Sequence, residues 1–132
     1  MRRWVFRSCL LWLALGFCLA GCQGNADQGA ARVIEKYLQA KAASNVDQVT
    51  LLSCPAWEAQ ARLEATSFHS MNATLNGVVC QVSGSGGGAT MVTCRGKIVT
   101  TYQGEAREWS VADHPYKAVQ QDGEWLMCGY GQ

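Results

Sequence analysis

The sequence has few of the residues on which catalytic and metal sites depend. Its 132 residues include only 2 histidines and 2 prolines, and charged residues make up 16% of the chain. No pair of cysteines is spaced as CxxC and no cysteine–histidine cluster occurs, so a zinc or dithiol redox site is not expected. A Ser-His-Asp order and a phosphate-binding glycine loop are also missing. We therefore expect no metal, no cofactor and no catalytic residue that a motif would identify.

Charge is distributed unevenly along the chain. Arg2, Arg3 and Arg7 lie at the start, and no acidic residue precedes Asp27. Removing those three from the 11 basic residues leaves 8 against 10 acidic residues, so the rest of the chain is slightly acidic. It has no basic stripe, and nucleic-acid binding is therefore not expected.

An apolar run over residues 9–20 follows these arginines. Twelve helical residues span about 18 Å, whereas the hydrocarbon core of a bilayer is roughly 30 Å thick. A charged start with a short apolar run is typical of a secretory signal peptide, which we assign to residues 1–21. An uncleaved N-terminal anchor is the alternative.

The end of this signal, Leu19-Ala20-Gly21-Cys22, resembles the lipobox of bacterial lipoproteins. The resemblance implies cleavage after Gly21 and acylation of Cys22 with chains such as palmitate, which would anchor the protein to a membrane. It also implies a location in the bacterial cell envelope. With Gln23 after the lipidated cysteine, this would be the periplasmic face of the outer membrane in a diderm, and the outer face of the plasma membrane in a monoderm.

The mature chain divides into a tether and one domain. Residues 22–29 are small and polar, which favours a lipidated flexible tether, although they could equally form the start of the first helix. Residues 30–132 suit a single domain.

Four cysteines remain after the signal and the lipidated position are set aside: Cys54, Cys80, Cys94 and Cys128. An even number in an exported domain predicts two disulfides, with three pairings open. Cys80 and Cys94 flank a glycine-rich run as opposed residues of a hairpin would, so we favour Cys80–Cys94 and Cys54–Cys128.

The first half of the domain has helical periodicity. Apolar residues recur at helical spacing from Ala30 to Leu38, which predicts a helix that ends near Ser44-Asn45. A short second helix follows, and Pro55 is expected at the first position of a third helix. The third helix carries a stripe that we interpret as core rather than as a partner-binding face: Trp57, Ala61, Ala65 and Phe68.

The second half alternates as β-strands do. We expect about four strands joined by hairpins, the third of them interrupted near His114-Pro115 and then resuming. Their expected ranges are Leu75–Val82, Thr90–Tyr102, Ala106–Ala112 with Tyr116–Gln120, and Glu124–Tyr130. This order predicts an α+β fold in which N-terminal helices pack on a curved antiparallel sheet.

Three short motifs within residues 28–130 resemble the cone-shaped nuclear-transport-factor-two-like fold: Val33-Ile34-x-x-Tyr37-Leu38-x-Ala40, Val46-Asp47 and Asp122-Gly123-Glu124-Trp125-Leu126. A cystatin-like arrangement with one helix on a sheet is the nearest competitor. The resemblance implies a cone-like roll that encloses a pocket between sheet and helices. Six aromatic residues are candidates to line that pocket, or else to fill the core: Tyr37, Trp57, Phe68, Tyr102, Trp109 and Trp125.

Two functions from different classes remain open. One is a non-enzymatic envelope lipoprotein that binds a small ligand or an envelope protein; a homodimer through the sheet stays open. The other is a small dehydratase-, isomerase- or cyclase-like enzyme. The enzyme would need a buried ionisable group that faces a pocket, and the candidates are Asp113, His114, Glu108 and His69.

Overall fold

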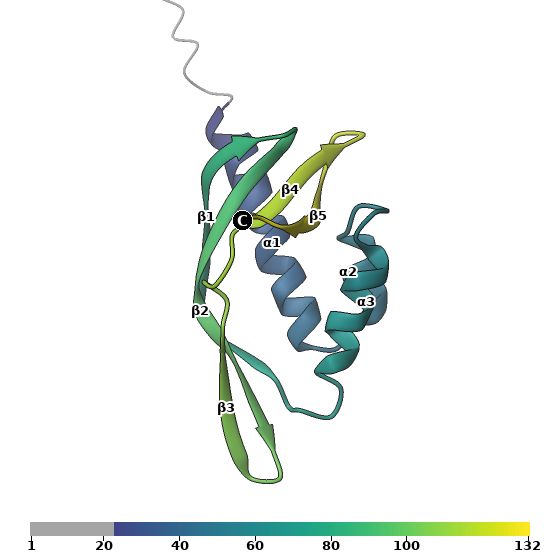
Figure 1. Ribbon diagram of the computed structural model, residues 1–132, viewed down its shortest axis with the longest axis vertical. Coiled ribbons are helices and arrows are strands. Elements are labelled where there is room, and N and C mark those ends of the chain that lie inside the picture. The colour runs from purple at the N-terminus through teal and green to yellow at the C-terminus, as the bar shows by residue number, and fades with distance from the viewer. Residues whose placement is uncertain (1–22) are drawn as a thin grey trace, which may run out of the picture.

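The computed structural model describes residues 23–132 as three helices followed by an antiparallel sheet of five strands (Figure 1). The helices are α1 (Gln23–Ala42), α2 (Val46–Leu51) and α3 (Glu58–Ser67). The expected α+β class is confirmed. The signal peptide 1–21 and the lipobox with Cys22 lie outside the described residues.

Helix α1 begins within the segment that the sequence left open between a tether and the first helix, and helix α3 begins later than expected. Helix α1 begins at Gln23, so residues 23–29 form its first turns. Helix α3 begins at Glu58 rather than at Pro55, because residues 54–57 first form a turn in which the Trp57 N–H donates to the Cys54 carbonyl. Helix α2 begins after Asn45, whose side chain accepts a hydrogen bond from the Gln48 N–H at 3.0 Å.

The sheet is built around one long central strand, β2. Strand β1 pairs along one edge of β2, while β3 and β4 pair with opposite ends of its other edge. The break at His114-Pro115 that the sequence predicts separates β3 from β4, and β5 pairs with β4. The bounds are β1 Thr74–Gly86, β2 Ala89–Tyr102, β3 Glu105–Ser110, β4 Tyr116–Gln121 and β5 Glu124–Tyr130.

The core lies between the helices and one face of this sheet. The largest fully buried side chains come from α1, α2, β2 and β5 and from the segment after α2: Tyr37, Ile34, Leu38, Met127, Val49, Val92 and Cys54. Ala61 and Ala65 of α3 are fully buried, and Trp57 and Phe68 pack against the cluster, so the predicted stripe is core.

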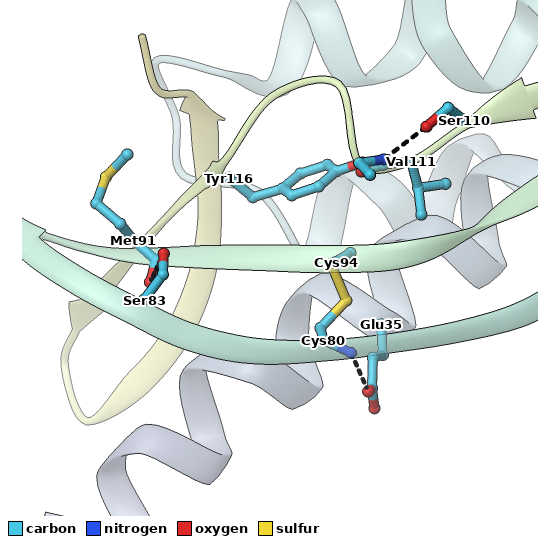
Figure 2. The surroundings of a disulfide bond; sticks show 9 residues. Glu35, Cys80, Ser83, Met91, Cys94, Ser110, Val111 and Tyr116 are labelled. Atoms are coloured by element: carbon cyan, nitrogen blue, oxygen red, sulfur yellow. Dashed lines mark hydrogen bonds between the residues drawn. A yellow bond between two sulfur atoms is a disulfide. The ribbon is translucent and has the colours of Figure 1, made fainter.

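Both predicted disulfides are present. Cys80 and Cys94 are opposed residues of β1 and β2, with Cα atoms 4.1 Å apart. Beside them, the Glu35 carboxylate of α1 accepts a hydrogen bond from the Cys80 N–H at 3.0 Å (Figure 2). An α1 side chain therefore covers part of the outer edge of β1.

The second disulfide, Cys54–Cys128, joins the segment after α2 to β5. There the Cys54 N–H donates to the Met127 carbonyl at 2.9 Å, and the Met127 N–H donates to the Leu52 carbonyl at 2.7 Å. Residues 52–54 thus cover the outer edge of β5.

Two disulfides indicate an oxidising, extracytoplasmic location. Among the helices of residues 23–132, none is both long and apolar enough to cross a membrane.

Candidate functional site

The hairpin of β2 and β3 projects beyond the helices at the end of the molecule opposite to the start of α1 (Figure 1). Its register runs from Lys97 opposite Ser110 to Tyr102 opposite Glu105. Gln103 and Gly104 connect the strands with φ values of 51° and 81°, as a tight two-residue hairpin turn requires. This places the last residues of β2 and all of β3 in solvent.

One face of this hairpin carries a groove with a volume of about 340 Å³. Residues of β2 and β3 form its floor, and a residue from the loop before β1 contributes to its wall. The lining residues are Met71, Thr100, Tyr102, Glu105, Arg107 and Trp109.

Trp109 is held in the groove by a hydrogen bond and by an aromatic contact. Its indole N–H donates to the Thr100 hydroxyl at 3.1 Å, and its ring meets Phe68 edge-on with 6.5 Å between the ring centroids. The side chain is nevertheless 46% exposed, and Tyr102 nearby is 58% exposed. Large aromatic side chains that are held in place yet exposed are typical of binding surfaces.

Charged side chains of both signs lie beside these aromatic side chains. Glu105 and Arg107 are two residues apart on β3, so both side chains lie on the groove face with Trp109. On the opposite face, Lys97 and Glu108 form an ion pair. The groove can therefore offer one anionic group, one cationic group and an aromatic ring in a row.

The structure does not bring the six candidate pocket residues to one place. Tyr102 and Trp109 line the hairpin groove, and Phe68 packs against Trp109 without lining the groove. Trp125 lines a separate groove of about 340 Å³ between α1, α2 and β5, together with Gly29 and Leu51. Tyr37 and Trp57, by contrast, belong to a cluster inside the molecule.

That cluster is centred on the carboxylate of Glu64, whose side chain is 11% exposed. Its Oε2 atom accepts hydrogen bonds from the hydroxyls of Tyr37 at 2.9 Å and Tyr130 at 2.8 Å, and it lies 3.0 Å from Lys41 Nζ. The Trp57 indole N–H donates to the Tyr37 hydroxyl at 3.2 Å. One oxygen of this largely buried α3 carboxylate is thus paired by groups from α1 and β5.

Burial raises the pKa of the Tyr37 and Tyr130 phenols well above their usual range, and the negative charge of Glu64 raises both further. Both hydroxyls therefore keep their protons at physiological pH and act as donors to Glu64. No described groove reaches this cluster. The cluster therefore has a structural role, because it links α1 and α3 to β5 of the sheet.

The four acid–base candidates lie elsewhere. Asp113, His114, Glu108 and His69 are all exposed, and none of them lines a groove described for residues 23–132. Asp113 and His114 belong to the connection between β3, which ends at Ser110, and β4, which begins after Pro115. Within the described residues there is also no group of three or more potential metal-ligating side chains.

Sequence reasoning missed two sets of residues. Glu64 lies three residues from Ala61 on α3, so a charge on the apolar stripe was the available signal for the buried cluster. For the groove, Glu105 and Arg107 share the alternation of Trp109, but nothing local indicates that the helices leave this face uncovered. Comparisons of the chain with protein-family models, curated proteins and solved structures found no match.

Proposed function

We propose that this protein is a lipid-anchored, non-enzymatic binding module of the bacterial cell envelope, and that the β2–β3 hairpin groove binds a protein partner. The observation that carries the proposal is the exposure of Trp109 and Tyr102 beside Glu105 and Arg107 on a projecting hairpin. Fixed aromatic side chains supply contact area at little cost in conformational entropy, and the two charges supply specificity.

The geometry of the chain supports the anchored form of this proposal. Cys22, the lipobox cysteine, directly precedes the first residue of α1, and the hairpin lies at the other end of the molecule (Figure 1). A lipid on Cys22 would therefore hold the protein with its groove directed away from the membrane. Two or more acyl chains would make this anchoring stable.

The pocket-enzyme alternative has no comparable support. It requires a buried ionisable group at a pocket, whereas its four candidate residues are exposed. Glu64 is a largely buried carboxylate, but Tyr37, Tyr130 and Lys41 surround it.

The lipid anchor is tested by the mass of the protein extracted from its own membrane in mild detergent. We expect residues 22–132 plus acyl chains, and a gain of four hydrogens on reduction of the two disulfides. The variant Cys22→Ser should lack the acyl mass and leave the membrane fraction. A full-length mass without acyl chains would overturn the anchor.

The groove is tested by site-specific photo-crosslinking in intact membranes. A benzoylphenylalanine in place of Tyr102 should crosslink to a discrete partner, whereas the same group in place of Leu63, 67% exposed on α3, should not. Trp109→Ala should reduce the Tyr102 crosslink. Equal crosslinking from both positions, or none from Tyr102, would overturn the binding function of the hairpin.

A further inference from the structure

The outer edge of β3 is open, and its backbone groups are free to pair. Among residues 23–132, β2 is the only helix or strand that β3 contacts, and all six residues of β3 are exposed. The outer edges of β1 and β5, in contrast, are met by Glu35 and by residues 52–54. An unprotected edge strand is a template for another extended chain.

The residues of β3 that direct backbone groups to this edge can be identified. The Val111 N–H donates to the Gly96 carbonyl at 3.2 Å, and the Thr100 hydroxyl reaches the Arg107 carbonyl at 3.5 Å. Because bonding alternates along an antiparallel ladder, the odd-numbered residues of β3 face β2. The N–H and C=O groups of Ala106 and Glu108 therefore point to the open edge.

A second copy of the chain fits this edge poorly. Pairing two copies of β3 in antiparallel fashion must match even-numbered residues with even-numbered residues. Of the two such registers that overlap most of the strand, one places Arg107 opposite Arg107 and the other places Glu108 opposite Glu108. Like charges directly opposite each other destabilise a strand pair. The edge therefore disfavours self-association and favours a different partner.

We propose that the edge of β3 binds an extended peptide segment of another protein by adding it to the sheet as an antiparallel strand. This inference rests on the proposed function and names its partner class. Side chains of such a segment opposite Trp109, Arg107 and Glu105 lie on the groove face, at the close non-hydrogen-bonded positions. Charge complementarity then specifies the segment, read from its N-terminus, as apolar-x-acidic-x-basic.

The test uses the full chain in detergent micelles and fluorescein-labelled peptides, with binding followed by anisotropy. The matched peptide contains Phe-Thr-Glu-Thr-Lys, and the exchanged peptide contains Phe-Thr-Lys-Thr-Glu. We expect the exchanged peptide to bind about tenfold more weakly, because two attractive cross-strand pairs become repulsive. The protein variant Glu105→Lys/Arg107→Glu should invert this preference, which separates a charge effect from a folding defect.

The backbone pairing is tested separately within the peptide. N-methylation of the residues opposite Ala106 and Glu108 removes the N–H groups that β3 would accept, and should abolish binding. N-methylation of the residue opposite Arg107 alters the outer side of the added strand, and should leave binding nearly unchanged. Equal loss from both modifications would overturn strand addition.

The outcomes distinguish this inference from the function on which it rests. Equal or undetectable binding of the matched and exchanged peptides overturns the inference. The proposed function then stands if benzoylphenylalanine at position 102 still crosslinks to a discrete partner in intact membranes. If position 102 gives no crosslink either, both the strand-addition inference and the proposed binding function of the hairpin are overturned. A concentration-dependent dimer that Ala106→Pro abolishes would assign the edge to a second copy and would also overturn the inference.

Discussion

At the scale of single residues, Glu64 links three parts of the fold. One of its oxygens is shared by Tyr37 and Lys41 of α1 and by Tyr130 of β5. Hydrogen bonds to a charged group contribute more than those between neutral groups, and a buried charge without a partner is costly. The carboxylate therefore makes the packing of α1, α3 and β5 interdependent.

Glu64→Gln should lower the free energy of unfolding by about 2–4 kcal/mol, because it leaves Lys41 without its counter-charge inside the protein. Urea unfolding measures this loss. The matched control Glu124→Gln, at an exposed position of β5, should change stability by less than about 0.5 kcal/mol. The double variant with Lys41→Met should lose less than the two single losses together; simple additivity would contradict the pairing.

The buried tyrosines predict a loss of stability at alkaline pH. Burial, and then the charge of Glu64, raises the pKa of Tyr37, Tyr116 and Tyr130 above the ordinary value of about 10. Above that pH the unfolded chain releases these protons and the folded chain keeps them. The free energy of unfolding should therefore fall with rising pH, by up to about 1.4 kcal/mol per pH unit for each tyrosine.

Urea unfolding at about pH 8, 10 and 11 measures this dependence, and Tyr130→Phe should reduce the slope by roughly a third because it removes one of the three groups. The prediction would be contradicted if the tyrosinate absorbance of these three residues rose at the same pH in the folded and the unfolded protein.

At the scale of elements, β1 and β2 approach each other so closely at Gly96 that no side chain fits there. Gly96 of β2 has a φ of 105°, and a Cβ atom there would lie 2.5 Å from the Gly77 carbonyl oxygen. Gly77 lies where the register of β1 shifts against β2. A register shift of this kind locally bends and twists a strand pair.

Gly96→Ala should therefore destabilise the protein by about 2–4 kcal/mol, through backbone strain and steric overlap together. Gly84→Ala on the same strand pair is the control, since a Cβ atom there meets nothing within 4 Å. Thermal unfolding of both variants measures the difference. Equal midpoints would show that β2 can move away from Gly77.

Elements were also the scale at which the sequence was most informative. Alternation and turn residues predicted every strand within a few residues, and the glycine-rich turn predicted the Cys80–Cys94 pairing, because these depend on neighbours in the chain. Alternation along β2 gives Tyr102 the same face as the buried Ile98 and Thr100. It could not show that the helices end before Tyr102, which leaves this side chain exposed. Coverage of a face depends on the relative lengths and positions of separate elements.

At the scale of the whole molecule, the two disulfides restrict the unfolded chain to different extents. Cys54–Cys128 spans 74 residues and joins the helical half to the last strand, whereas Cys80–Cys94 spans 14 residues within one hairpin. The longer loop removes more conformational entropy from the unfolded state. The cross-link between the two halves is therefore the larger contribution to overall stability.

Removing the long link with Cys54→Ala/Cys128→Ala should cost about 4 kcal/mol, against about 3 kcal/mol for Cys80→Ala/Cys94→Ala. Chemical unfolding of the two double variants gives the comparison. A larger loss from the hairpin link would mean that native packing around Cys80, rather than loop length, determines the effect.

The strand-like contact of residues 52–54 with β5 also bears on the order in which the protein folds. A chain that emerges N-terminus first releases residues 52–54 early, yet their partner Met127 comes only with the last described strand. Pairing them closes a loop of more than 70 residues, and such distant contacts form slowly. We therefore expect the core of the helical half to be completed only after β5 has docked against residues 52–54, so this docking should be a late step of folding.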